Sequence, residues 1–484
     1  MKQLDCTTFS EEVGNLKPRH CFAQMHEFLK KCQNEDALRQ TNLMEIFGLK
    51  NTGKTTLLKQ LVALSDIPAD EWLFIETDEE DTVEDLEKLI LNIRYNEIRF
   101  IVIDQITKVK NFLSHFVILY DALDMCGKHV LISGDETLLI EFANMERFHL
   151  IGGLSINVGK IRTTYMSFPE YCYLYGSNNF DEYLRYGGLM YDQNIGPFVT
   201  GIESCKEYVR EAVAANIHES VLEIDDINDN GLRLKYLSEY EIFVLAEKSI
   251  EERFYPMHIY SKEYEPEKIE WSRVLIRQYL READAVSAFP GKFYVLSESD
   301  AMEEHKREMY LIQPALRFFH HMQIVASVGR SGISDNWTQE YIDACIFKNL
   351  TKQAVLSDTD HFLNHKISVA YKIYFAHGEN QDFYKTVDML IHDRDRNQYR
   401  IFKITHASDA TQIADEQQLN ARETDLLNKE FGTQDGAYVL YNGKTTKSAT
   451  GTICLNISDF LLALDKYKDV DKVMEALTAD LQSS

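Results

Sequence analysis

The sequence has little proline and glycine, no long apolar run and no paired cysteine motif. Its 484 residues include 8 Pro and 22 Gly against 26 Tyr and 26 Phe, a balance that argues against long disordered tracts. No window approaches the roughly 18 uninterrupted apolar residues that a membrane span needs, and the first residues form no apolar signal-peptide core. The 8 Cys are scattered without CxxC or zinc spacing. We expect a soluble cytoplasmic protein with free thiols and no membrane partner.

Basic residues are scarce relative to acidic ones. The chain has 51 Lys+Arg and 77 Asp+Glu, which gives a formal net charge of -26. The average field of such a chain does not attract a nucleic-acid backbone or an anionic membrane surface. Any polyanion must therefore be held by a local site. The length predicts two to four domains, because single hydrophobic cores stop growing near roughly 250–300 residues.

One segment, GLKNTGKTT at residues 48–56, matches the phosphate-binding pattern GxxxxGK[ST] between an apolar stretch and a Leu-rich helical pattern. Gly48 and Gly53 let the backbone wrap closely around phosphate oxygens, and amides at the helix start point at the anion. Lys54 supplies a charge for the outer phosphates, and the Thr55 hydroxyl can bind Mg²⁺. The predicted cofactors are therefore ATP and Mg²⁺. The remaining loop contacts are assigned to Asn51, Thr52 and Thr56.

The second component of such a site is an apolar strand that ends in Asp. The segment IRFIVIDQ at residues 98–105 supplies it, and Asp104 is the candidate metal carboxylate. Gln105 follows where a water-activating carboxylate is usual, and an amide can orient water but cannot take its proton. Ser133, on the next strand, stands where a polar residue commonly senses the terminal phosphate. We predict ATP binding with weak hydrolysis, and Asp104, Gln105 and Ser133 as the catalytic group.

Apolar strands alternate with amphipathic helices around these motifs, which predicts a parallel sheet covered on both faces. We expect strands at 72–77 and 129–133, and helices at 83–93 and 111–126. The strand between the phosphate loop and Asp104 indicates the additional-strand class of P-loop NTPases. Asp135 and Glu136 follow the strand at 129–133. They fit either a substitute base or a solvated helix start, and we prefer the second interpretation.

Several further motifs are similar to those of one family. They are IDQI at 103–106, SFPEY at 167–171, FDEYLRYGG at 180–188, MYLIQPAL at 309–316, and Val387-Asp388 with Phe402-Lys403. Together with the phosphate loop, they make the chain resemble prokaryotic AAA-related ATPases that join a P-loop domain to a lid, a winged helix and a restriction-endonuclease-like domain. The departures are Lys50-Asn51, Gln105 and Met190, where the family has Arg-Arg, Glu and Pro.

We expect an α/β fold in five segments, of which the spacing of apolar residues predicts the first and the resemblance implies the other four. These are an N-terminal helical arm at 1–41 with a helix over 16–32, a P-loop AAA-type ATPase domain at 42–168, a helical lid at 169–245, a winged-helix domain at 246–330 and a degenerate PD-(D/E)XK nuclease-like domain at 331–484. The resemblance also allows Arg185 a nucleotide-sensing role, with an exposed helix arginine as the alternative. Arg147, Lys160 and Arg162 stay open as candidates for a phosphate contact from the same or a neighbouring subunit.

The nuclease-like segment lacks one residue that the chemistry needs. Metal-dependent phosphodiester hydrolysis requires clustered carboxylates and usually a lysine. The resemblance offers Glu340, Asp388 and Lys403, but Ile401 stands where an acid is needed two residues before the lysine. The net charge of this segment is also negative, which disfavours a broad DNA-binding face. We therefore interpret these three residues as the remnant of a nuclease site.

Three functions are compatible with the sequence. The first is a P-loop ATPase with weak or regulated turnover, in which nucleotide switches the arrangement of the C-terminal domains. The second is a nucleotide-stabilised interaction module without turnover, which binds a protein partner or a second copy of itself. The third is an ATP-gated nuclease, and nucleic-acid binding through the winged helix stays open although the charge disfavours it.

Overall fold

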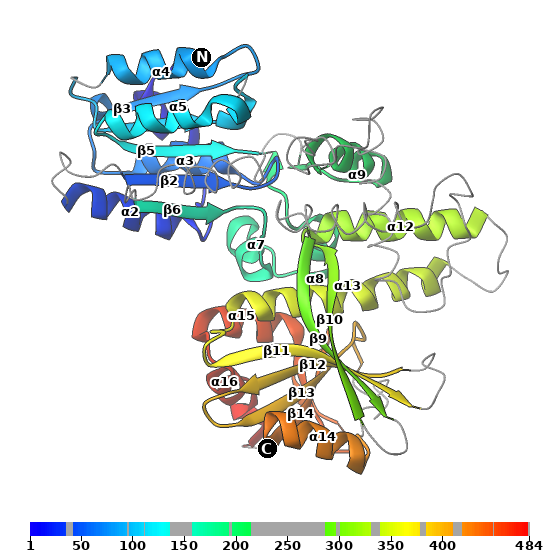
Figure 1. Ribbon diagram of the computed structural model, residues 1–484. Coiled ribbons are helices and arrows are strands. Elements are labelled where there is room, and N and C mark those ends of the chain that lie inside the picture. The colour runs from blue at the N-terminus through cyan, green and yellow to red at the C-terminus, as the bar shows by residue number, and fades with distance from the viewer. Residues whose placement is uncertain are drawn as a thin grey trace. The chain divides into compact units, whose positions relative to one another are not determined.

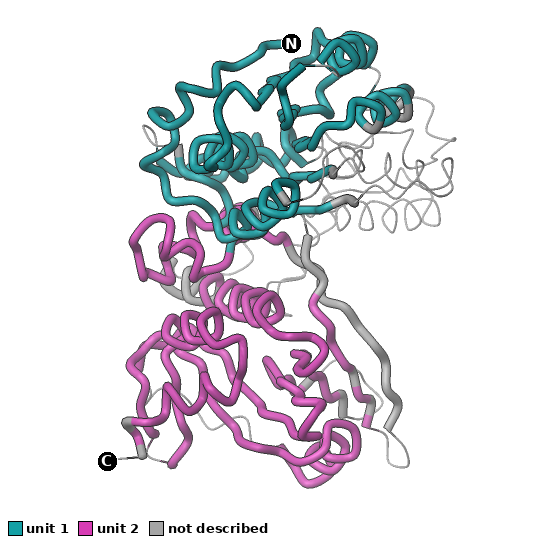
Figure 2. The backbone as a smooth tube through the Cα atoms, turned by 90° about the vertical axis from the view of Figure 1, so that its left-hand side faces the viewer, with its two compact units in different colours: residues 1–166, 188–241, 263–285 teal, residues 167–187, 242–262, 286–484 magenta. Residues whose placement is uncertain are grey.

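The computed structural model describes most of the chain, and its elements are drawn in Figure 1. The described residues are 1–34, 42–93, 96–110, 112–135, 157–192, 196–213, 286–296, 301–330, 339–377, 384–409, 419–448 and 450–482. They form two compact units, coloured separately in Figure 2. The first comprises residues 1–166, 188–241 and 263–285, and the second comprises residues 167–187, 242–262 and 286–484.

The first unit is built on a six-stranded sheet with the order β1-β3-β4-β5-β2-β6. Its strands are β1 (Lys2–Leu4), β2 (Asn42–Phe47), β3 (Trp72–Glu76), β4 (Phe100–Asp104), β5 (His129–Gly134) and β6 (Asn157–Arg162). All neighbouring strands are parallel except β1, which pairs antiparallel with β3 at the edge. β5 lies between the strand that leads into the phosphate loop and the strand that ends in Asp104.

Helices cover both faces of this sheet, because its central strands are apolar on both sides. α4 (Val83–Asn92) and α5 (Phe112–Met125) pack on one face in a core that includes Leu86, Leu119 and Ile103. α1 (Phe9–Val13), α2 (Phe22–Asn34) and α3 (Lys54–Leu64) pack on the other face. The predicted doubly covered parallel sheet is present, with element ends within two residues of those expected.

The N-terminal arm differs from the expected helix. Helix α2 begins at Phe22 instead of residue 16, because Pro18 lacks a backbone N–H and disfavours helical geometry in the residue before it. The first residues form β1, which extends the sheet, and the short helices η1 (Cys6–Thr8) and α1. The arm is thus an integral part of the first unit.

The second unit contains an eight-stranded mixed sheet with the order β10-β9-β11-β12-β13-β14-β16-β15. Its strands are β9 (Val286–Leu296), β10 (Ala301–Leu311), β11 (Ser368–His377), β12 (Tyr384–Asp393), β13 (Gln398–Ile404), β14 (Thr433–Tyr441), β15 (Thr446–Lys447) and β16 (Ile453–Asn456). Its helices are α7 (Phe168–Tyr175), α8 (Phe180–Tyr186), α12 (Pro314–Arg330), α13 (Gln339–Phe362), α14 (Ala421–Phe431), α15 (Ile457–Tyr467) and α16 (Val470–Gln482).

These units divide the chain differently from the five expected segments. The start of the expected lid, α7 and α8, belongs to the second unit, whereas α9 (Ile202–Tyr208) and the π-helix η4 (Val209–Val213) belong to the first. The motif at 309–316 begins in β10, which forms a hairpin with β9, and β9 pairs in parallel with β11, across the expected boundary at residue 331. The first part of the expected winged-helix segment, residues 246–285, lies outside the described residues.

Candidate functional site

The phosphate loop connects β2 to α3 and has the backbone geometry that the glycine pattern predicts. Gly53 has a φ of 89° and ends the loop at the first turn of α3. Gly48 lies against β6: a Cβ atom there would stand 2.5 Å from the Thr163 hydroxyl oxygen. Asn51 also has a positive φ of 62°, which costs free energy in a residue with a side chain. The loop is therefore a tight and strained turn held by its surroundings.

The Lys54 ammonium is almost fully buried and makes three contacts at the loop. Its Nζ donates to the Gly48 carbonyl at 2.9 Å and to the Leu49 carbonyl at 2.8 Å. It also forms an ion pair with Asp135, with Nζ and Oδ1 2.6 Å apart. An ammonium has three N–H donors, so these contacts match its full capacity. Asp135 thus faces the phosphate loop, whereas the sequence favoured a solvated helix start for this residue.

Asp104 lies at the carboxyl end of β4 and joins three of the predicted residues. Its Oδ2 accepts a hydrogen bond of 2.7 Å from the Thr55 hydroxyl, and its Oδ1 accepts one from Ser133. Burial raises the pKa of this carboxyl above its usual value, while the bonds from Ser133 and Thr55 and the charge of Lys54 act in the opposite direction. A carboxylate and a hydroxyl at this spacing present two adjacent oxygens to one point.

Oxygen ligands of this kind are those that Mg²⁺ prefers, and Mg²⁺ in phosphate sites is commonly held by one or two carboxylates plus the substrate. Thr55 is the second residue of α3, and the free backbone amides in the first turn of a helix favour an anion. The residues present therefore fit Mg·ATP: Thr55 and Asp104 would hold the metal, and the loop amides with Lys54 would hold the phosphates.

Gln105 has an unusual local conformation. Its φ and ψ are 61° and 38°, the left-handed region that non-glycine residues rarely adopt. Its backbone N–H donates to the Ser133 hydroxyl at 3.1 Å, which ties it to the Asp104 group. Its side-chain oxygen Oε1 is buried and has no hydrogen-bond partner among the described residues. A buried acceptor without a partner is costly, and strained residues of this kind concentrate at functional sites.

The other loop candidates have different surroundings. Thr52 is fully buried, and its hydroxyl bonds the Leu49 carbonyl at 2.8 Å and the Thr163 hydroxyl at 2.7 Å, so this side chain stabilises the loop itself. Thr56 is half-buried in the first turn of α3. Leu49 donates its backbone N–H to the Thr164 hydroxyl at 3.0 Å. Two threonines that follow β6 thus fasten the start of the loop.

Three contacts on the loop come from residues that the sequence does not predict to lie at the loop. Arg19, which is 4% exposed, donates to the Thr52 carbonyl at 2.9 Å. The backbone N–H of Met190 donates to the Asn51 carbonyl at 2.9 Å, and the Tyr208 hydroxyl donates to the Lys50 carbonyl at 2.6 Å. These residues are far apart in the chain, so only the folded structure brings them to the loop.

The candidate arginines and lysine fall in several places. Arg185 in α8 belongs to the second unit, where its guanidinium lies over the rings of Phe318 and Phe347 at 5.5 and 5.2 Å. Arg185 is also exposed on α8, which agrees with the expected alternative of an exposed helix arginine. Lys160 and Arg162 are exposed on β6, and Arg162 lies 5.1 Å from the ring centre of Phe47. Glu136 and Arg147 lie outside the described residues.

Asp388, one of the predicted remnant residues of a nuclease site, has two partners in the structure. Asp388 is buried on β12, where its Oδ1 pairs with the Lys352 ammonium at 2.9 Å and its Oδ2 accepts from the Ile404 amide at 2.9 Å. Lys352 lies on α13, twelve residues after Glu340 on the same helix. Lys403 is half-buried on β13. The Asp388 carboxylate is therefore neutralised by Lys352.

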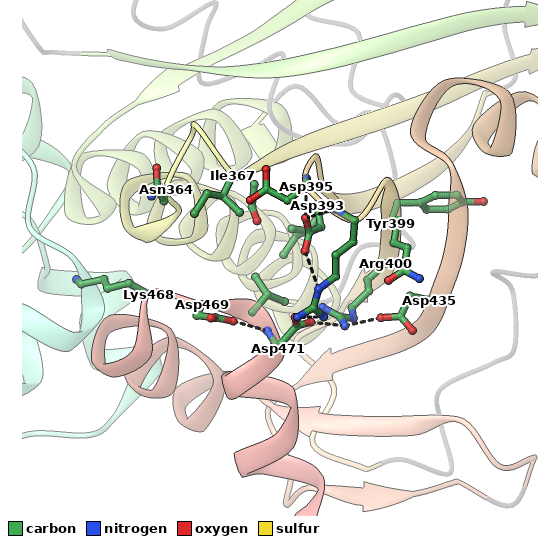
Figure 3. Close-up of a pocket in the computed structure, with 15 residues that line it drawn as sticks. Asn364, Ile367, Asp393, Asp395, Tyr399, Arg400, Asp435, Lys468, Asp469 and Asp471 are labelled. Carbon is green, nitrogen blue, oxygen red and sulfur yellow. Dashed lines mark hydrogen bonds and ion pairs between the residues drawn. The ribbon is translucent and has the colours of Figure 1, made fainter.

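A cavity of about 270 Å³ in the second unit lies near the tip of the β12–β13 hairpin, as Figure 3 shows. Arg400 pairs there with Asp435 and with Asp471, the latter at 2.5 Å, and Arg396 pairs with Asp471. The carboxylates of Asp435 and Asp471, which line this cavity, are thus paired with these two arginines. Among the described residues, no group of three or more His, Cys, Asp or Glu side chains could hold a metal ion.

A family model described as an AAA domain matches residues 40–172. These residues therefore form an AAA-type P-loop ATPase domain, which implies ATP binding. A search of curated proteins finds no match. Within the part of the chain that the structure describes, no helix has the length and apolar character to cross a membrane.

Solved structures with similarity include a Walker-type ATPase of Pyrococcus abyssi, at 12% identity and a TM-score of 0.33, over 64% of this chain and 99% of that one. The Orc1 protein of Aeropyrum pernix in complex with DNA has 12% identity and a TM-score of 0.26, over 67% of this chain and 98% of that one. The PCH-2 protein of C. elegans has 12% identity and a TM-score of 0.26, over 58% of this chain and 74% of that one.

Proposed function

We propose that this protein is a Mg·ATP-dependent P-loop ATPase with slow turnover, in which bound nucleotide switches the arrangement of the C-terminal domains. The observation that carries the proposal is the group of Lys54, Thr55, Asp104 and Ser133 around one loop. The sheet order supports it as well, because β5 separates the loop strand from the Asp104 strand, as the additional-strand class requires.

Binding requires Lys54 to change partners. Its ammonium would leave the Asp135 carboxylate for the outer phosphates, while Thr55 and Asp104 would turn their paired oxygens to the metal. When bound, Mg²⁺ would neutralise charge on the phosphates. The backbone amides of the loop and the first turn of α3 supply the remaining donors, so the site does not depend on the acidic net charge of the chain.

Slow turnover follows from Gln105. Its amide oxygen, buried and without a partner among the described residues, can accept a hydrogen bond from the attacking water and orient it. It cannot accept the proton, and the loss of a general base typically costs roughly 10²–10⁴ in rate. We therefore place Gln105 as the water-positioning residue and Ser133 as the link between Gln105 and Asp104.

A route from the nucleotide to the C-terminal domains exists along the chain. Met190 donates its N–H to the phosphate loop at Asn51, and Gly187, three residues earlier, accepts from the Ala315 N–H at the start of α12 at 3.1 Å. In the proposed switch, a change at Asn51 would reach Gly187, a residue bonded within the second unit, through three peptide bonds. This connection supports a switching role over simple nucleotide storage.

The alternative is a nucleotide-stabilised interaction module that binds a protein partner or a second copy of itself. The pairing of Asp388 with Lys352 favours it over a nuclease, because the buried carboxylate is already neutralised. Winged-helix and nuclease-like assignments stay proposals for residues 246–330 and 331–484.

The test is calorimetric titration of Mg·ATP into the full chain and into Lys54→Ala, together with measured phosphate release. Lys59→Ala is the matched control, since Lys59 lies on the same helix but pairs with Glu12 at 2.6 Å, outside the loop. The proposal expects binding and slow release that Lys54→Ala abolishes and Lys59→Ala preserves. Binding without any release would support the interaction module, and Mg²⁺-dependent DNA or RNA cleavage that Asp388→Ala removes would establish the nuclease.

A further inference from the structure

We propose that Arg19, Tyr208 and the backbone N–H of Met190 form an outer clamp that sets the direction of three consecutive peptide groups in the phosphate loop. The inference rests on the proposed function, because it concerns how the same site is made ready for phosphate. It assigns Arg19 and Tyr208 as positioning residues, which act on the loop and not on the nucleotide.

Three consecutive carbonyls of the phosphate loop are each held by a donor from outside the loop. The carbonyls of Lys50, Asn51 and Thr52 follow one another in the loop, and each accepts a hydrogen bond from a different donor outside it. Two of the donors lie side by side, since a Cβ atom built on Gly53 would stand 3.1 Å from Met190 Cγ and 3.7 Å from Arg19 Cδ. One stretch of loop backbone is therefore held on its outer side.

The consequence comes from peptide geometry. In a planar trans peptide the C=O of one residue and the N–H of the next point in opposite directions. Holding the carbonyls of residues 50, 51 and 52 outward therefore turns the N–H groups of Asn51, Thr52 and Gly53 to the opposite side. Consecutive N–H groups directed to one side form an anion-binding concavity, the arrangement that a phosphate chain requires.

The loop needs such restraint. Asn51 and Gly53 have positive φ angles of 62° and 89°, so the conformation is strained and persists only where the surroundings fix it. A peptide released from its outer donor could rotate and turn its carbonyl oxygen toward the phosphates. Binding would then have to restore the orientation and would be weaker for every ligand that carries the phosphates.

Arg19 does more than a single donor could. Its guanidinium also bonds the Thr163 carbonyl and the Tyr165 carbonyl, the latter at 2.6 Å, beyond the end of β6. A planar fork with fixed donors can hold three carbonyls in one geometry, whereas a lysine ammonium on a flexible stem cannot reproduce it. Arg19 thus joins the loop to the segment whose threonines fasten the loop start.

The test uses Tyr208→Phe, which removes one hydroxyl and keeps the ring. Tyr441→Phe is the matched control, because the Tyr441 hydroxyl also donates to a backbone carbonyl, that of Lys444, in the second unit. We expect Tyr208→Phe to weaken Mg·ATP binding by roughly 3- to 10-fold, the loss typical of one neutral hydrogen bond. Arg19→Lys should weaken it further, and Tyr441→Phe should bind as the wild type does.

Two readouts separate positioning from general damage. Inorganic pyrophosphate with Mg²⁺, used as a competitor, should lose affinity for Tyr208→Phe by the same factor as ATP, because the defect lies in the phosphate loop. The melting temperature without nucleotide should stay within one or two degrees of the wild type. If Tyr208→Phe proves unstable, Arg19→Lys gives the same comparison.

Equal affinities for wild type, Tyr208→Phe and Arg19→Lys would overturn the clamp and leave the proposed function standing. A loss for ATP with none for pyrophosphate would also overturn it, because the defect would then lie in contacts with the nucleoside. Failure of the wild type itself to bind Mg·ATP would overturn both the proposed function and the clamp.

Discussion

The ion pair between Lys54 and Asp135 leads to a quantitative prediction for Asp135→Asn. A nucleotide must displace this carboxylate to reach the ammonium, so the pair acts as an internal competitor for the phosphates. The two charged atoms are 2.6 Å apart, and the side chains are 5% and 23% exposed. The substitution keeps the shape of the side chain and removes its charge, which weakens the competitor without opening a cavity.

The size of the effect follows from this geometry. At this separation the Coulomb attraction is roughly 6 kcal/mol for an effective dielectric constant of about 20, and desolvation offsets much of it. A hydrogen bond to a charged group retains a net contribution of about 1.5–3 kcal/mol. Since about 1.4 kcal/mol corresponds to a tenfold change in affinity, Asp135→Asn should bind Mg·ATP about 10- to 100-fold more tightly.

The assay is titration of Mg·ATP at constant ionic strength, with phosphate release measured in parallel. Asp66→Asn is the control, because Asp66 is an exposed residue of the same unit and its substitution changes the net charge equally. Equal or weaker binding by Asp135→Asn, relative to Asp66→Asn, would refute the competitor role. A fall in turnover at unchanged affinity would instead identify Asp135 as the base that Gln105 cannot be.

Three further predictions concern other side chains. Gln105→Glu should raise phosphate release by at least tenfold, and an unchanged rate would mean that the missing base does not limit turnover. Lys352→Met should destabilise the second unit by about 3–5 kcal/mol, because it leaves the buried Asp388 carboxylate without its cation; denaturant unfolding measures this, and Lys352→Met with Asp388→Asn should recover most of the loss. The bond from His406 lowers the pKa of Asp181, so its stabilisation is present above about pH 4 and is lost as the pH falls through the lowered pKa. Asp181→Asn should therefore reduce the melting temperature slightly at pH 7, and the difference from the wild type should shrink as the pH falls through the lowered pKa; a difference that is constant with pH would contradict the assignment.

The local elements of the first unit could be predicted well because their signals are short-range. The glycines of the phosphate loop, the alternation of apolar strands with amphipathic helices and the Asp at the end of a strand each depend on a few consecutive residues. The structure brings Lys54, Thr55, Asp104 and Ser133 together because parallel strands end at one edge of the sheet. These four residues lie together because of the parallel sheet topology, and the alternation of strands and helices in the sequence predicts that topology.

The partners of these residues could not be predicted in the same way. Nothing near Arg19 in the sequence indicates a residue that holds carbonyls at 52, 163 and 165, and Tyr208 is one tyrosine among 26. The local sequence of Asp135 favours a helix start, and only the fold places its carboxylate beside Lys54. Such contacts depend on how distant segments pack, which local propensity does not encode.

The second unit shows the same limit at the level of domains. The motif at 180–188 predicts part of a lid, and in the structure α8 belongs to the second unit, where Asp181 bonds His406 and Arg185 lies over two aromatic rings. By itself, the sequence determined the phosphate loop, the strand that ends in Asp104 and the presence of Gln105 after it, because these features lie in adjacent residues. Only the tertiary structure decided that Lys352 neutralises Asp388, which donors hold the loop and which unit each helix joins, because those outcomes depend on long-range packing and burial.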